Sequence, residues 1–299
     1  MAKPTVLITG CSDGGLGSAL ALEFHATGHR VFATARNPAK LANAKAAGIE
    51  TLALDVLSDS SIEKCVAGVR QLTGGSLDIL VNNAGAVYNA PLVDASIPGA
   101  RKLFDLNVWS NLATIQAFLP LLLKSTHGGL IVNHTSISSV LCPPFTALYG
   151  ASKAALAMLT VSLRAELSPF GVKVVDLKSG PVKSNINSNQ TDQKPAVSNK
   201  SLYYSAREWL DHFLSGKTIM EGSILADLWA KKVVAALSQR NPPDSVWVGP
   251  LTWTVWLGSC LPSSISQALT RNVSRVDFVE KSIQQYGKEK AIADAYSEQ

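Results

Sequence analysis

The sequence predicts an α/β fold built on a doubly wound parallel sheet. Short apolar runs rich in Val, Ile and Leu alternate with longer segments of helical periodicity. A glycine-rich loop joins the first apolar run to the first helical segment. No linker or compositional break interrupts this alternation through Ser184, so we expect one sheet domain with helices on both faces, followed by a lid and a tail.

Each predicted strand is followed closely by a predicted helix. Thr5–Thr9 is the first buried strand, and Leu16–Ala26 is its helix, which ends at Gly28. The other predicted strands are Arg30–Ala35, Glu50–Leu54, Leu77–Asn82, Leu130–Thr135, Val172–Leu177 and Ser245–Val248. The other predicted helices are Pro38–Ala47, Ser58–Leu72, Pro98–Lys124, Ala147–Leu167, Leu202–Leu214 and Glu221–Gln239.

Composition excludes several classes of protein. The chain has 299 residues, of which 46% are hydrophobic and 16% charged, and this favours a compact, apolar globule. The net charge of +5 is scattered and forms no basic run, so we expect no nucleic-acid partner. The four cysteines form neither a CxxC pair nor a metal-ligand spacing, which indicates a reducing compartment and no metal site. A strand begins almost at Met1, so we expect no targeting peptide and a cytoplasmic location.

The loop Thr9–Gly17 lies between a strand and a helix, the context that dinucleotide binding requires. Glycines there let the backbone turn sharply and approach a pyrophosphate, whose charge the helix amino terminus favours. The alternative is a tight turn without a ligand. The residues expected to contact the cofactor in this loop are Gly10, Ser12, Asp13, Gly15, Leu16 and Gly17.

Arg36 stands at the end of the second strand, where the adenosine ribose of a dinucleotide is expected. An acidic residue at this place would hold a free 2′-hydroxyl, whereas a guanidinium pairs with a 2′-phosphate. The sequence therefore favours NADP over NAD. The alternative is a solvated charge at the end of a strand.

Tyr149 and Lys153 share one face of a predicted helix, thirteen residues after Ser136. A nearby cation favours a phenolate and brings proton exchange by tyrosine closer to neutral pH. This chemistry indicates an oxidoreductase acting on ketones or alcohols. His134 is expected to be a hydrogen-bonded core or cleft residue, and Cys142 a packing residue.

These motifs, taken together and in order, resemble the short-chain dehydrogenases/reductases over residues 4–250. The matching segments are Thr9–Gly17 as Thr-Gly-x4-Gly-x-Gly, Asp55-Val56, Asn82-Asn83-Ala84-Gly85, Asn107, Ser136, Tyr149-x3-Lys153 and Ser179–Ser184. Within the family, the Gly-Cys-Ser opening and the Trp-rich tail most resemble fungal reductases related to 1-acyl-dihydroxyacetone-phosphate reductase. The resemblance implies a Rossmann-type catalytic domain at residues 1–250, a lid at about 185–220, and an extension at 251–299 that is Trp-rich and then helical.

The resemblance also implies roles for four catalytic residues. Tyr149 would be the general acid in reduction and the general base in oxidation. Lys153 would lower the pKa of Tyr149 and, with Tyr149, hold the nicotinamide ribose, while Ser136 would donate a hydrogen bond to the substrate oxygen. Asn107 would anchor a water chain behind Lys153.

Further cofactor contacts follow from the same resemblance. They are Asp55 and Val56 at the adenine, Asn82, Ala84 and Gly85 along the adenosine side, and Gly180, Val182 and Ser184 near the nicotinamide. Two positions depart from the family pattern. The glycine loop has one residue more than usual, and Ser179 stands where the family has proline.

The expected reaction is NADPH-dependent reduction of an apolar ketone, or the reverse oxidation of a secondary alcohol. Aromatic residues in the lid favour a lipid, a steroid-like ketone or a fungal secondary metabolite. A non-redox cyclase or isomerase and an NADP-binding regulatory module are the alternatives. The uncharged helix at 106–123 and the Ala-rich helix at 147–167 offer apolar faces, which predict a homodimer or homotetramer. Trp247, Trp253 and Trp256 allow two hypotheses, a tail packed on the protein body and peripheral contact with an endoplasmic-reticulum or lipid-droplet surface.

Overall fold

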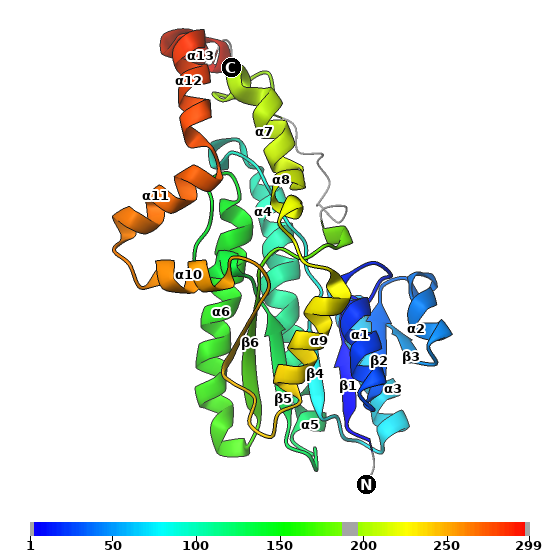
Figure 1. Cartoon of the computed structure of the whole chain (residues 1–299). Coiled ribbons are helices and arrows are strands. Elements are labelled where there is room, and N and C mark those ends of the chain that lie inside the picture. Colours follow the sequence, from blue (N-terminus) through cyan, green and yellow to red (C-terminus); the bar gives the residue numbers. More distant parts are fainter. Residues whose placement is uncertain (1–2, 187–196, 297–299) are drawn as a thin grey trace.

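A seven-stranded parallel sheet forms the centre of the computed structural model, which describes residues 3–186 and 197–296 (Figure 1). The strand order is β3-β2-β1-β4-β5-β6-β7, and every neighbouring pair is parallel. The order reverses between β1 and β4, so a crevice opens there at the carboxyl ends of the strands. The strands are β1 Thr5–Ile8, β2 Arg30–Ala35, β3 Glu50–Ala53, β4 Ile79–Asn82, β5 Leu130–His134, β6 Lys173–Ser179 and β7 Ser245–Val248.

Helices cover both faces of the sheet, as the sequence predicts for a doubly wound fold. In β1, Val6 and Ile8 pack on one face with α1 and α9, while Leu7 packs on the other face with α3 and α5. This alternation gives two apolar cores separated by one layer of strands. The helices of this domain are α1 Leu16–Ala26, α2 Ala42–Ala46, α3 Asp59–Thr73, α4 Ile97–Phe104, α5 Ser110–Leu122, α6 Ala147–Leu167 and α9 Ala226–Leu237.

Two predicted helices are interrupted. The long helix predicted over Pro98–Lys124 is observed as helical backbone from Ile97 to Leu122, but a π-helical turn at Asp105–Trp109 separates α4 from α5 within it. The helix predicted over Pro38–Ala47 begins as a short 3₁₀ turn at Pro38–Lys40 before α2. In both cases the apolar spacing identifies the helical region but does not reveal the change of winding within it.

The lid and tail gather beyond the carboxyl ends of the strands (Figure 1). The predicted lid helix at Leu202–Leu214 is shorter than expected, with a 3₁₀ turn at Tyr204–Ala206 before the α-helix. Part of the predicted polar segment, residues 187–196, lies outside the described residues. The helices of this region are α7 Arg207–Leu214, α8 Lys217–Glu221, α10 Thr252–Ser259, α11 Ser263–Val273, α12 Val276–Tyr286 and α13 Lys288–Tyr296.

The tail packs on the lid through α12. Val279 of α12 is buried in one apolar cluster with Phe213 and Leu210 of α7. Phe145, which lies four residues before Tyr149, belongs to the same cluster. The lid is therefore in contact both with the carboxyl-terminal extension and with the loop that leads to the predicted catalytic helix.

Candidate functional site

The glycine loop closes tightly at the amino end of α1. Gly10 has a φ of +71°, a left-handed conformation that side chains disfavour, and an added Cβ would lie 2.9 Å from the Cα of Ala84. A Cβ on Gly17 would lie 2.5 Å from the Gly10 carbonyl. The first residue before α1 is Gly15, and no side chain caps this helix. Its first backbone N–H groups can therefore hold a phosphate, which is the chemistry that a dinucleotide requires.

Asp13, the central residue of the lengthened loop, has a structural role. Its carboxylate accepts hydrogen bonds from the backbone N–H groups of Ala42 (2.9 Å) and Asn43 (3.1 Å) at the start of α2. Its own N–H donates to the carbonyl of Lys40. Asp13 thus ties the glycine loop to the turn that follows β2. The exposed Arg36 lies just before that turn, at the carboxyl end of β2.

Asn83 belongs to the segment Asn82–Gly85 that is expected along the adenosine side, and it holds the glycine loop. Its side-chain amide donates to the carbonyls of Thr9 (2.8 Å) and Gly10 (3.1 Å). The hydroxyl of Thr9 in turn accepts hydrogen bonds from the backbone N–H groups of Asn83 and Ala84, each at 2.9 Å. These reciprocal bonds fix the glycine loop against the end of β4. The adjacency of Asn83 to the matched Asn82 was the available signal.

Asn107 lies in the π-helical turn between α4 and α5 and is completely buried. Its amide binds both backbone polar groups of Ala86, each at 2.9 Å, and donates to the Ser152 hydroxyl at 3.0 Å. Ser152 donates in turn to the carbonyl of Tyr149. The widened turn, a feature common at functional sites, directs Asn107 toward the start of α6. Its role in a water chain stays a prediction.

Lys153 is buried beside Tyr149 on α6, as the spacing predicts. Its ammonium donates to the carbonyl of His134 at 2.8 Å and lies 5.9 Å from the centre of the Tyr149 ring. Burial lowers the pKa of Lys153 to about 8, and the charge of Asp176 opposes that shift. Lys153 is therefore mostly charged at pH 7.

The pKa of Tyr149 differs from the expectation. Burial raises it to about 12, while a hydrogen bond from Ser136 opposes the rise. The cost of burying a phenolate outweighs the hydrogen bond from Ser136 in the protein alone. The Tyr149 phenol is thus neutral throughout the physiological pH range. The expected lowering of its pKa by Lys153 stays a prediction.

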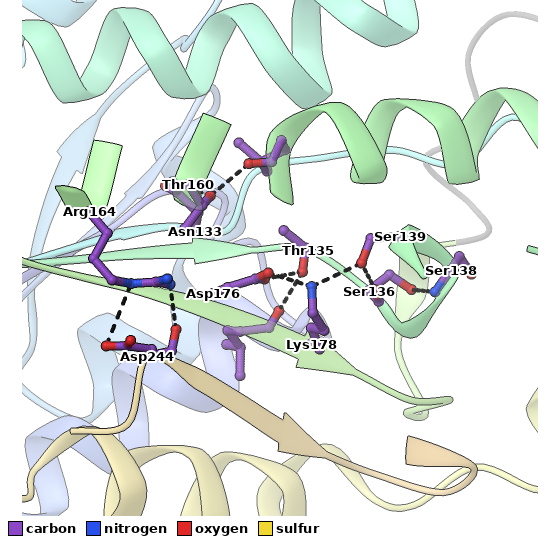
Figure 2. A network of polar contacts seen from close by, with 12 residues as sticks. Asn133, Thr135, Ser136, Ser138, Ser139, Thr160, Arg164, Asp176, Lys178 and Asp244 are labelled. Atoms are coloured by element: carbon purple, nitrogen blue, oxygen red, sulfur yellow. Dashed lines mark hydrogen bonds and ion pairs between the residues drawn. The ribbon is translucent and has the colours of Figure 1, made fainter. Parts of the chain in front are cut away.

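The loop that carries Ser136 is supported by a polar network beneath it (Figure 2). The Ser136 hydroxyl accepts a hydrogen bond from the N–H of Ser138, and the Ser136 carbonyl accepts one from the hydroxyl of Ser139 at 2.6 Å. Ser139 is itself bound by Lys178 of β6, whose ammonium pairs with the buried Asp176. Ser136 is therefore held from its backbone, and its own hydroxyl hydrogen can point toward Tyr149.

Several other predicted cofactor residues have structural roles. Asn82 is buried, and its side chain bonds Asn133 of β5 and Thr114 of α5, so its amide groups are engaged between the sheet and that helix. Asp55 accepts a hydrogen bond from the N–H of Leu57 and forms a local turn, and Val56 packs in the core.

The predicted residues after β6 also pack closely. A Cβ on Gly180 would lie 2.0 Å from the Pro250 carbonyl, so this glycine permits close approach of two chain segments. Val182 is buried and forms a bridge to Ile224, whereas Ser184 is half-buried. Their contacts with a cofactor, like those of Ser12, Leu16, Ala84 and Gly85, stay predictions.

The two cysteines near the cleft have packing roles. Burial raises the pKa of Cys11 to about 12, and its thiol donates to the carbonyl of Ile8. Burial also raises the pKa of Cys142, whose sulfur contacts Thr146. Neither thiol has the depressed pKa of a reactive nucleophile.

The tail exposes large apolar side chains on α10. Trp253 is 79% exposed and Trp256 46% exposed, and their rings contact each other edge to face. None of the helices within residues 3–186 and 197–296 has the length and apolarity needed to cross a membrane. Peripheral membrane contact and homo-oligomerisation stay predictions.

Comparison with known proteins identifies the family. Residues 4–195 match the family model of short chain dehydrogenases. A short-chain dehydrogenase/reductase of Pestalotiopsis microspora is 42% identical over 94% of this chain and 98% of its own length. The NADPH-dependent 1-acyldihydroxyacetone phosphate reductase of Schizosaccharomyces pombe is 35% identical over 92% of this chain and 95% of its own length.

Solved structures show the same fold. A short-chain dehydrogenase from Streptomyces avermitilis superposes with a TM-score of 0.73 and 25% identity, covering 96% of each chain. A Burkholderia cenocepacia short-chain dehydrogenase in complex with NADP gives a TM-score of 0.70 at 24% identity, over 90% of this chain and 97% of that one. The chain therefore belongs to the short-chain dehydrogenase/reductase family of oxidoreductases, with a Rossmann-type fold.

Proposed function

We propose that this protein is an NADP(H)-dependent oxidoreductase that reduces a fairly apolar ketone or oxidises the corresponding secondary alcohol. The observation that carries the proposal is the grouping of Ser136, Tyr149 and Lys153 at the carboxyl end of β5 and the start of α6. A neutral phenol, a hydroxyl donor and a buried cation are the groups needed to protonate a carbonyl oxygen as its carbon is reduced.

In the proposed reduction, a bound NADPH supplies the hydride that reaches the carbonyl carbon. The Tyr149 hydroxyl gives its proton to the carbonyl oxygen, which becomes the product hydroxyl. The Ser136 hydroxyl binds the same oxygen and stabilises the negative charge that develops there. The Lys153 ammonium stabilises the phenolate left on Tyr149 until solvent returns the proton.

The chain's own residues fit an NADP nucleotide. The uncapped amino end of α1 suits the pyrophosphate, and the close contacts of Gly10 and Gly17 leave no room for side chains that would block it. Arg36 is exposed at the end of β2, and no ion pair within the described residues engages its guanidinium, which suits a 2′-phosphate. The related reductase from Schizosaccharomyces pombe is NADPH-dependent, which supports NADP as the cofactor of this protein too.

An apolar substrate is supported by the residues between α7 and the catalytic loop. The Phe145 ring contacts Tyr203 and Phe213 edge to face, with centroids 5.6 and 6.4 Å apart. Trp209 stacks on Phe213 at 5.1 Å. An acyl-glycerone phosphate, another lipid ketone or a fungal secondary metabolite would each bring apolar surface to this cluster.

The test is to mix the purified protein with NADPH and a panel of lipid and polycyclic ketones, and to follow absorbance of the reduced nicotinamide. We expect consumption of NADPH with at least one ketone and much slower consumption of NADH. The proposal would be contradicted if the protein bound NADPH but neither reduced any ketone of a broad panel nor oxidised any of the corresponding alcohols with NADP.

A further inference from the structure

His134 is a buried residue that the proposed proton transfer does not use. It ends β5, and its backbone carbonyl accepts the Lys153 ammonium. Both ring nitrogens also have partners, because Nδ1 lies 3.0 Å from Oδ1 of Asn83 and Nε2 lies 2.8 Å from Oγ of Ser179. The ring stacks on Trp229 of α9, with centroids 5.3 Å apart and planes inclined by 21°. His134 thus contacts Lys153 of α6, Asn83 beside the glycine loop, and Trp229 of α9.

The partners of this ring determine where its proton lies. The side-chain nitrogen of Asn83 donates to two carbonyls of the glycine loop, so the oxygen of the same amide must face His134. An amide oxygen only accepts hydrogen bonds, so Nδ1 of His134 carries the hydrogen. At neutral charge Nε2 is then an acceptor.

The hydrogen bonds on the Nε2 side of the ring agree with this assignment. The indole nitrogen of Trp229 can only donate, and it lies 3.0 Å from the Ser179 hydroxyl oxygen. The Ser179 hydroxyl accepts that hydrogen bond and donates its own hydrogen to Nε2 of His134. Every group donates in one direction, from Trp229 through Ser179, His134 and Asn83 to the glycine-loop carbonyls.

A charged ring does not suit this place. Burial lowers the pKa of His134 to about 3, and the neighbouring charge of Lys153 lowers it further. The ring therefore stays neutral through the physiological range.

We propose that the neutral, Nδ1-protonated ring of His134, aligned by Ser179 and Trp229, is a positioning residue that holds Asn83 on the glycine loop and thereby sets the affinity for the dinucleotide. This inference rests on the proposed NADP(H)-dependent function. It gives Ser179, which departs from the family's proline, a specific role, since proline has no hydroxyl to join Trp229 to His134.

The geometry explains why a small movement of Asn83 would matter. A Cβ on Gly17 would lie 2.5 Å from the side-chain nitrogen of Asn83 as well as from the Gly10 carbonyl. Asn83, the glycine loop and the first turn of α1 are therefore in direct contact. An Asn83 amide free to rotate would release the loop carbonyls and misplace the helix N–H groups that hold phosphate.

The experiment measures the dissociation constant for NADPH by fluorescence titration of the full chain without ketone. In His134→Phe the ring remains and both hydrogen bonds are lost, so we expect the constant to rise about tenfold, the change that about 1.4 kcal/mol produces. Trp229→Phe keeps a smaller aromatic ring against His134 and removes the N–H, and we expect a rise of about threefold. Thr160→Val is the matched control, because it removes a buried hydroxyl that accepts from Asn133, the neighbour of His134 on β5, and donates to Leu156, while the bonds of Asn83 to the glycine loop stay in place.

Equal dissociation constants for His134→Phe and Thr160→Val, with normal binding by the unaltered protein, would overturn this inference and leave the proposed function standing. Failure of the unaltered protein to bind NADPH would overturn the proposed function and this inference with it. A second measurement needs no variant at position 134. Nitrogen NMR of the unaltered protein, assigned with variants of the other four histidines, should show a neutral His134 ring with its hydrogen on Nδ1, and a hydrogen on Nε2 would overturn the inference.

Discussion

The two sides of the cleft are held together by different forces. On the cofactor side, Asn83, Asn107 and Asp13 each bind backbone groups of another segment at 2.8–3.1 Å. On the lid side, Phe145 and Phe213 meet neighbouring rings through apolar packing. Directed hydrogen bonds fix individual atoms, whereas packed rings can rearrange at constant volume. The comparison suggests a cofactor side built for one ligand and a lid side whose shape adapts to the substrate.

The largest effect should come from Lys153→Met on the cofactor side. This change removes the buried charge and keeps an apolar side chain of similar length. We expect kcat for ketone reduction to fall by about 10²- to 10⁴-fold, the range associated with loss of acid–base assistance. Because Lys153 is buried, thermal unfolding of the variant measures whether the fold survives. A fully active, folded variant would show that the cation is not needed.

A change on the lid side should separate substrate binding from cofactor binding. Phe213→Ala removes a ring that is 1% exposed and packs on Phe145, so we expect the fold to lose about 3 kcal/mol of stability and the loosened lid to raise the KM for an apolar ketone by about tenfold. The dissociation constant for NADPH should not change. Phe278→Ala is the control, because Phe278 contacts Trp209 in the same region but is 41% exposed. It should have a much smaller effect on KM. A parallel loss of NADPH affinity in Phe213→Ala would mean that the two sides are not independent.

Arg36→Ala tests the cofactor side without touching its buried hydrogen bonds. We expect the preference for NADPH over NADH to fall by about tenfold, because a charge-assisted pair with the 2′-phosphate is lost. The ratio of kcat/KM for the two cofactors measures this preference. An unchanged ratio would assign discrimination to another residue.

The smallest effect should appear in the pH profile. Lys153 has a pKa of about 8, below its ordinary value, so its charge is present below pH 8 and lost as the pH rises through that value. We expect kcat/KM for NADPH, which reports the free enzyme, to be level below about pH 7 and to decrease above pH 8. Tyr149 stays protonated up to about pH 12 and should add no step in this range. A profile level to pH 10 would contradict the lowered pKa.

Features that depend on local sequence patterns could be predicted from the sequence. The alternation of apolar runs predicted the sheet, and the strand Ser245–Val248 was predicted at its observed bounds. The spacing of Tyr149 and Lys153 placed both on one face of α6, because helical periodicity is a local property. The chemistry of the site follows from such local patterns.

Other features depend on contacts between distant segments and leave no local pattern. The π turn at Asn107 depends on Ala86 and Ser152, which lie on other elements. Asp13 is expected from the loop motif to contact the cofactor, and no local pattern indicates that its carboxylate binds the start of α2. The pKa of Tyr149 depends on burial, which spacing alone does not measure. Packing of α12 on α7 was likewise unpredicted, since apolar side chains do not specify their partners.

The most direct test of the central claim is single-turnover oxidation of bound NADPH by Tyr149→Phe, with a ketone that the unaltered protein reduces. The phenylalanine keeps the ring and removes the hydroxyl that is proposed to deliver the proton. We predict that the variant still binds NADPH and that, at saturating NADPH, its rate of oxidation is lower by about 10²- to 10⁴-fold. Oxidation by Tyr149→Phe at the rate of the unaltered protein would contradict the account.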